Sequence, residues 1–226
     1  MRKFRLNVKI EWKSKLIDLL IVIIGITIAF KLNNWNESRK IFNEEKAYKL
    51  SFYDENKINQ ENLTSALDFS ESTKKDIDTL KTILLSKKYS DERIQNLIAS
   101  MMAMSDFNPI TTTMENITAS GEFDLITDIE LRKILISTYN SFKTTTKLES
   151  LLVDYVNKYL TPFLFENIRF SDFSSLNSNF IKNPQFENIV LGYEALLYQQ
   201  INGYKTNLER LNLLNEKLTS ANISNK

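Results

Sequence analysis

The stretch LIDLLIVIIGITIAFKL, residues 16–32, is the longest apolar run of the chain, and it decides the architecture. A transmembrane α-helix needs about twenty predominantly apolar residues, with a lower limit near seventeen. The run meets that lower limit, although Asp18 and Lys31 interrupt its ends. It therefore predicts one short transmembrane helix over residues 16–34, which needs flanking side chains that suit the interfaces between membrane and water.

Four side chains next to the run suit the two interfaces between membrane and water. Tryptophan is enriched at both interfaces, and lysine extends its methylene stem through lipid to place its ammonium group among the headgroups. A helix between the two tryptophans is roughly 35 Å long at about 1.5 Å per residue, which matches a hydrocarbon core and part of each interface. We therefore expect four interface anchors: Trp12, Lys15, Lys31 and Trp35.

Three other interpretations of the run remain open. It is a buried core helix in one of them, which the preceding basic residues and the flanking tryptophans disfavour. A cleaved signal peptide has a similar basic start and apolar centre, but Thr27-Ile28-Ala29 is a poor small-x-small cleavage site. A helix that lies flat in the interface is amphipathic, whereas this run is apolar on all its faces.

The charge bias on either side of the run predicts its orientation. Basic residues dominate residues 1–15 over the single acid Glu11, whereas the far flank mixes both signs. Lysine and arginine are enriched on the cytoplasmic side of a membrane. In a bacterium this places a basic segment, residues 1–15, in the cytoplasm and a domain of residues 35–226 in the periplasm, anchored to the inner membrane. The absence of cysteine agrees with a domain that forms no disulfides.

Composition predicts an all-α fold for the large domain. The chain contains only 4 Gly and 3 Pro in 226 residues, and no segment alternates apolar and polar residues for long enough to indicate a strand. Neither Gly nor Pro occurs from Trp35 to Lys88, so the transmembrane helix is expected to continue into a bundle of four or five helices. Ile41, Tyr48 and Phe52 share one face of this continuation, which predicts a coiled-coil oligomer seam.

Local signals divide the remainder of the chain into helices. Ser90 is predicted to cap a helix that ends before Pro109. A capping-box spacing at residues 112–115 opens a short helix that stops at Gly121, and a second at residues 127–130 opens a long one. Pro162 is expected to kink or end the long helix, and Asn183-Pro184 begins the last helix.

The residue types exclude most catalytic chemistry. The chain has no histidine and no cysteine, which removes the usual zinc sites, histidine-dependent triads and thiol nucleophiles. Its neighbouring carboxylates, such as Asp54/Glu55, diverge on a helix and are expected on solvated faces. A formal net charge of +1 gives no reason to expect nucleic-acid binding. We predict no catalytic, cofactor or metal site, and no enzyme activity.

The functional candidates that remain lie in the transmembrane segment. A carboxylate in such a segment is costly and indicates a functional site, although Asp18 also lies within reach of Lys15 for an interfacial ion pair. Gly25 and Ala29 form a small-xxx-small pair, which permits close packing of helices in lipid. Asp18, Gly25 and Ala29 are therefore predicted to mediate helix packing or to line an ion path.

Two stretches resemble an uncharacterised family of Bacteroidota membrane proteins. Residues 20–40, LIVIIGITIAFKLNNWNESRK, are similar to its VVIGI-type anchor followed by NNWNE, with Asp18 where an acid is expected and Ile17 in place of a glycine. Residues 107–132 are similar to its central pattern, which contains F-x-P, S-G and E-L-R. The resemblance implies a single-pass membrane protein with a helical outer domain, and it brings no catalytic residues.

The sequence thus favours a non-enzymatic protein whose periplasmic domain self-associates or binds a partner. The expected partners are the lipid bilayer and either further copies of the chain or another membrane protein. The alternative is an oligomeric membrane effector or channel-forming subunit, in which Asp18 and the face of Gly25 and Ala29 surround a central axis.

Overall fold

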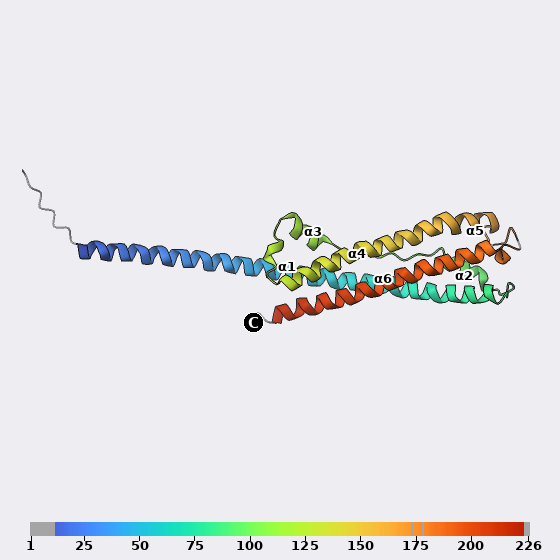
Figure 1. Ribbon diagram of the computed structural model, residues 1–226, viewed down its shortest axis with the longest axis horizontal. Coiled ribbons are helices and arrows are strands. Elements are labelled where there is room, and N and C mark those ends of the chain that lie inside the picture. Colours follow the sequence, from blue (N-terminus) through green and yellow to red (C-terminus); the bar gives the residue numbers. More distant parts are fainter. Residues whose placement is uncertain (1–11, 173, 178, 224–226) are drawn as a thin grey trace, which may run out of the picture. The chain divides into compact units, whose positions relative to one another are not determined.

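The computed structural model describes residues 12–172, 174–177 and 179–223, and within them the fold is all-α, as predicted (Figure 1). The chain divides into two compact units, residues 1–47 and 48–226. The described residues form no β-strand; a single isolated bridge pairs Ile168 with Ser175. The basic segment predicted over residues 1–15 lies outside the described residues as far as residue 11.

One helix, α1 (Trp12–Leu85), accounts for the described part of the first unit and continues into the second. The prediction that the apolar helix runs on beyond Trp35 is confirmed, because no glycine or proline interrupts the backbone hydrogen bonds over this range. The second compact unit begins at Tyr48, whereas the sequence placed the start of the outer domain at residue 35.

The second unit is a bundle built on three long helices. These are residues 48–85 of α1, α4 (Ile129–Tyr155) and α6 (Pro184–Ile223), and Figure 1 shows them side by side. Helix α6 runs antiparallel to α1, because Lys81 pairs with Glu194 near the end of α1 and Asn56 donates to the Leu211 carbonyl near its start. The shorter elements are α2 (Ile94–Ser100), α3 (Thr112–Ala119) and α5 (Thr161–Asn167), with 3-10 turns at Phe123–Leu125 and Phe180–Lys182.

Two apolar clusters fill the bundle. One lies around the last turns of α1 together with α2, α5 and the first half of α6, and Ile98, Leu160 and Tyr193 are among its members. The other joins Phe52, near the start of the unit, to α4 and to the second half of α6. Burial of these side chains is the main favourable term in forming the bundle.

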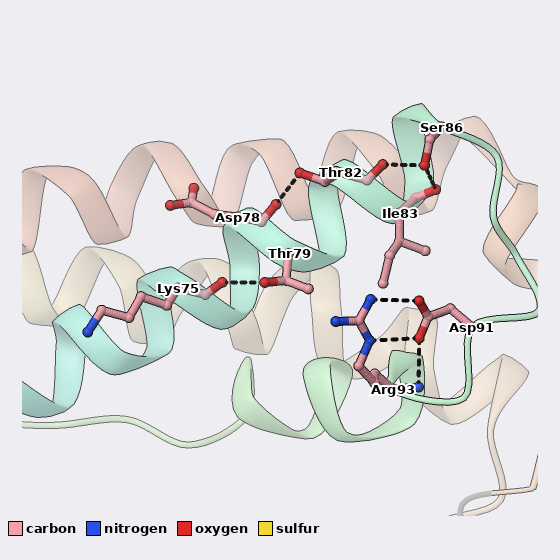
Figure 2. A network of polar contacts seen from close by, with 8 residues as sticks. All are labelled: Lys75, Asp78, Thr79, Thr82, Ile83, Ser86, Asp91 and Arg93. Atoms are coloured by element: carbon pink, nitrogen blue, oxygen red, sulfur yellow. Dashed lines mark hydrogen bonds and ion pairs between the residues drawn. The ribbon is translucent and has the colours of Figure 1, made fainter.

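Residues 86–93 differ from the prediction, because the helix expected from Ser90 begins only at Ile94. The Asp91 carboxylate accepts hydrogen bonds from the Arg93 backbone N–H and guanidinium, which fold this segment into a turn (Figure 2). The same contacts lower the pKa of Asp91 to about 2. On α1, the hydroxyl groups of Thr82 and Ser86 donate to backbone carbonyls of the preceding turn (Figure 2).

Helices α1 and α3 end with the same hydrogen-bond pattern. At the end of α1, the N–H of Lys87 donates to the Leu84 carbonyl and that of Lys88 to the Ile83 carbonyl, and Lys87 has φ 57°. Gly121 has φ 73° at the corresponding position after α3, where the sequence predicted the stop. Both ends are Schellman caps, which place one residue in the left-handed region.

Pro162 was expected to kink or end the long helix, and it does not end it. A π-helical turn over Val156–Leu160 joins α4 directly to α5, and the Thr161 N–H donates to the Val156 carbonyl, five residues earlier. Proline lacks an N–H, and its ring collides with the carbonyl four residues before it in a regular helix. Because the π turn is wider, the helix continues through the proline.

A side chain of α4 packs tightly against the backbone of α6 at Gly192. A Cβ atom on this residue would lie 2.1 Å from the Tyr155 hydroxyl oxygen and 2.7 Å from Cζ of the same ring. The Tyr155 hydroxyl donates to the Ile189 carbonyl at 3.1 Å, so the ring lies against the backbone of α6. Only glycine leaves enough space for this contact.

The two Schellman caps predict opposite effects of glycine exchange. Gly121→Ala should lower the free energy of unfolding by about 1 kcal/mol, because a left-handed L-residue costs about 1–2 kcal/mol. Lys87→Gly should raise it by up to about 1 kcal/mol, since the strain relieved exceeds the entropy that glycine loses on folding. Urea denaturation of the full-length protein in detergent, followed by circular dichroism, measures both. A loss of stability in Lys87→Gly would contradict the assignment of strain to that residue.

The packing of α4 on α6 gives a second prediction. Gly192→Ala should destabilise the bundle by about 1–3 kcal/mol through overpacking, although alanine is the better helix former. Adding Tyr155→Phe removes the atom closest to the new methyl group and should restore part of this loss. The measurement is a double-mutant cycle of unfolding free energies with Tyr155→Phe alone as the control. Additive single effects would show that the two residues are not in contact.

Candidate functional site

The described part of α1 from residue 15 to residue 40 is exposed in the single chain. This helix is long and apolar enough to cross a membrane, with a mean hydropathy of 2.2 over its most apolar window. The predicted interface anchors Trp12 and Trp35 are 76% and 62% exposed, and the Arg39 guanidinium lies over the Trp35 ring at 5.7 Å. Lys15 and Lys31 are exposed as well.

Asp18, Gly25 and Ala29 lie on one face of this helix. At about 100° per residue, positions 18, 25 and 29 fall within about 40° of one another. No heavy atom lies within 4 Å of a Cβ built on Gly25, so the face is open at this point. Among the ion pairs of the described residues, none joins Asp18 to Lys15, the pair that the sequence offered as an alternative.

The structure corrects the predicted oligomer seam at Phe52. Its side chain is 0% exposed and meets the Tyr139 ring at a centroid distance of 6.0 Å within the same bundle, so it is unavailable to another chain. The Tyr48 hydroxyl donates to the Glu122 carboxylate at 2.6 Å, which also engages it inside the unit. Ile41 is half-buried. Helical spacing places these residues on one face, and the chain itself covers that face at Phe52.

Two buried carboxylates hold the segment that leads into α3. Glu149 is 7% exposed and accepts hydrogen bonds from the Phe107 backbone N–H at 2.8 Å and the Tyr204 hydroxyl at 2.6 Å. Glu55 is 6% exposed and accepts from the Thr113 backbone N–H at 2.8 Å and the Tyr139 hydroxyl. The expectation that Glu55 lies on a solvated face is therefore wrong.

An asparagine completes the support of this segment. The Asn59 side chain is 0% exposed, donates to the Ile110 carbonyl at 2.8 Å and accepts from the Ile110 N–H at 2.7 Å. The side-chain amide of Asn59 thus pairs with both backbone groups of Ile110, as a neighbouring β-strand would. One signal for Glu149 is visible in the sequence, since it follows Phe142 and Thr145 at helical spacing on the buried face of α4. Sequence reasoning did not find that three side chains act together: Glu55, Asn59 and Glu149. Their common partner is the backbone of a segment far from them in the sequence.

Burial governs the titration of this network. Desolvation raises the pKa of Glu149, against the hydrogen bonds from Tyr204 and Phe107, which favour its charged form. Desolvation also raises the pKa of the Tyr204 and Tyr139 hydroxyls, which therefore remain protonated donors. The residues that the structure describes contain no group of three or more side chains able to hold a metal ion. The carboxylates of this network therefore bind backbone N–H groups and hold one segment in place.

A groove of about 780 Å³ lies between α3 and α4. Met114 of α3 forms one wall of the groove, with Tyr139 and Phe142 of α4 opposite. The polar residues on its edges include Glu115 on α3 and Lys143 and Lys147 on α4. The signal available in the sequence was the spacing of the two lysines, which lie four residues apart on one face of a helix.

Comparison of the chain with protein-family models, with curated proteins and with solved structures found no match.

Glu149 gives a prediction about pH. Because burial raises its pKa in the folded state, the folded protein binds more protons than the unfolded chain above the ordinary value of 4.5. The stability from this group is present below pH 4.5 and is lost as pH rises through the folded-state pKa. The free energy of unfolding of the wild type should therefore fall, relative to Glu149→Gln, between pH 4.5 and neutrality. Urea titrations at several pH values measure the difference, and one that does not change with pH would contradict the prediction.

Proposed function

We propose that the protein is a non-enzymatic, single-pass protein of a bacterial inner membrane, with a cytoplasmic N-terminus and a periplasmic helical domain. That domain self-associates or binds a partner membrane protein. The proposal includes membership of the Bacteroidota family with the VVIGI-type anchor, on the resemblance of residues 20–40 and 107–132. The basic residues before the apolar run support the orientation.

The observation that carries the proposal is the exposed apolar surface of α1. Side chains from Leu16 to Leu32, including Ile21 at 63% and Phe30 at 65%, are exposed along the helix. Leaving a large apolar side chain in water costs about 1.5–3 kcal/mol relative to burial, and soluble monomers rarely expose so large a continuous apolar surface. A lipid bilayer surrounds such a helix and removes its apolar side chains from water on every face.

The polar interior of the bundle supports a role without catalysis. Glu55 and Glu149 are occupied by backbone N–H and tyrosine hydroxyl donors, and both are buried away from the groove edges. A catalytic carboxylate needs access to a substrate proton or a reacting atom. These two groups instead tie a segment of backbone to three helices.

The common face of Asp18, Gly25 and Ala29 supports self-association in the membrane. Small residues let two helices approach closely, and association in lipid depends on such packing because lipid is as apolar as the side chains. The same face favours a channel-forming subunit as the second candidate, because Asp18 would then lie toward the axis of an assembly. Ion flux in liposomes distinguishes the two, since only the channel predicts a flux that Asp18→Asn reduces.

A prediction about oligomerisation tests the main proposal. Gly25→Leu with Ala29→Leu should weaken self-association of the full-length protein in lipid bilayers by about tenfold, because the added side chains hold the helices apart. Thr27→Leu places a leucine on the opposite face and serves as the control. Förster transfer between differently labelled chains, measured over a range of protein-to-lipid ratios, gives the affinity. A monomeric wild type at every ratio would refute self-association and leave partner binding to be tested.

A further inference from the structure

We infer that the groove between α3 and α4 binds an anionic amphiphile with a single apolar chain, such as a fatty-acid carboxylate. This goes beyond self-association or partner binding, and it does not depend on either. Three observations lead to it: the unpaired lysines on one edge, the apolar lining, and the size of the groove.

The two lysines supply an uncompensated positive charge. Lys143 and Lys147 are exposed, and no carboxylate in the described part of the chain lies within ion-pair distance of either. They lie one helical turn apart on the same face, where like charges repel. Glu115 on the opposite wall accepts a hydrogen bond from the Thr111 hydroxyl and leaves the groove with an excess of one positive charge. An anionic headgroup between the two lysines would relieve their repulsion.

The lining of the groove accounts for the apolar part of the ligand. Tyr139 and Phe142 are 7% and 2% exposed and form its inner wall on α4, with the half-buried Met114 facing them from α3. Ile136 is 47% exposed at the same face of α4 as the lysines, and so extends the apolar surface toward the solvent. A flexible methionine side chain adapts to a chain of variable shape.

The size of the groove favours a small ligand over a peptide helix. Its volume of about 780 Å³ lies in the usual range for small-molecule sites, about 300–1,000 Å³. A bound peptide helix is about 10–12 Å in diameter with its side chains, so even two turns of it occupy about the whole volume of the groove. Charge and size therefore point to the same class of ligand, a single chain with one acidic end.

The test is photocrosslinking of the full-length protein in lipid nanodiscs with a fatty acid that carries a diazirine near its apolar end. We expect covalent adducts on peptides that contain Met114 or Tyr139, identified by mass spectrometry. The same chain with an alcohol in place of the carboxylate is the control ligand. It should label the groove roughly tenfold less, as expected for the loss of two charge contacts.

Charge reversal in the protein gives the complementary comparison. Lys143→Glu with Lys147→Glu should reduce groove labelling by the fatty acid roughly tenfold or more, whereas Lys133→Glu, on the same helix outside the groove, should leave it unchanged. Labelling of residues 16–32 by probe dissolved in the bilayer gives an internal reference, and circular dichroism confirms that the variants fold. Equal labelling by the alcohol, equal labelling of the double variant, or adducts on the apolar helix alone would overturn the inference. Displacement of the probe by an acidic amphipathic peptide but not by palmitate would assign the groove to a protein partner instead.

Discussion

The bundle depends on satisfying the backbone of one extended segment. Residues 103–111 lead from α2 to α3 without helix or strand partners, yet part of this backbone lies among buried side chains. A buried peptide group without a hydrogen bond costs about as much as a lost hydrogen bond, so each must find a partner. Asn59 of α1 and Glu149 of α4 provide partners to Ile110 and Phe107, and Gln200 of α6 donates to the Ser105 carbonyl.

This arrangement explains why two acidic side chains are retained in the interior of the bundle. Replacing both members of a polar pair with apolar groups can be nearly neutral, but a backbone N–H cannot be replaced. Glu149 and Glu55 each accept from one backbone N–H and one tyrosine hydroxyl, so the removal of either would leave two donors unsatisfied. The network therefore fixes the path of one segment against three helices, and it also shapes the wall that faces α4 across the groove.

Much of the fold could be predicted from the sequence because its signals are local. The continuous α1 follows from the lack of glycine and proline, the end of α3 from Gly121, and the start of α6 from Asn183-Pro184. Asn183 accepts the Gln185 N–H, as its capping role requires. The long helix begins where expected, although its cap is Asp128 and not Thr127: the Asp128 side chain accepts the N–H groups of Glu130 and Leu131. Each of these outcomes depends on a few neighbouring residues.

The parts that could not be predicted depend on what covers a given face. Spacing placed Phe52 on an apolar stripe of α1 correctly, but it could not tell whether α4 of the same chain or another copy would cover it. Glu55 looks like one more surface acid until Thr113 and Tyr139 are brought to it from distant positions. The candidate groove has the same limitation, because its two walls come from separate helices and only the lysine spacing is visible in the sequence.

The π turn before Pro162 rotates the apolar stripe of one long amphipathic helix. An unbroken stripe with steps of four, three and four from Leu148 would place Tyr159 inside, yet Tyr159 is 46% exposed and Leu160 is 0% exposed. One additional residue in a turn rotates all later positions by about 100° relative to the earlier ones. Leu152 before the turn and Val156, Leu160 and Phe163 in and after it all belong to one apolar cluster. The additional residue thus keeps the apolar side chains that follow it on the same core as Leu152, so the helix still faces this core on the far side of Pro162.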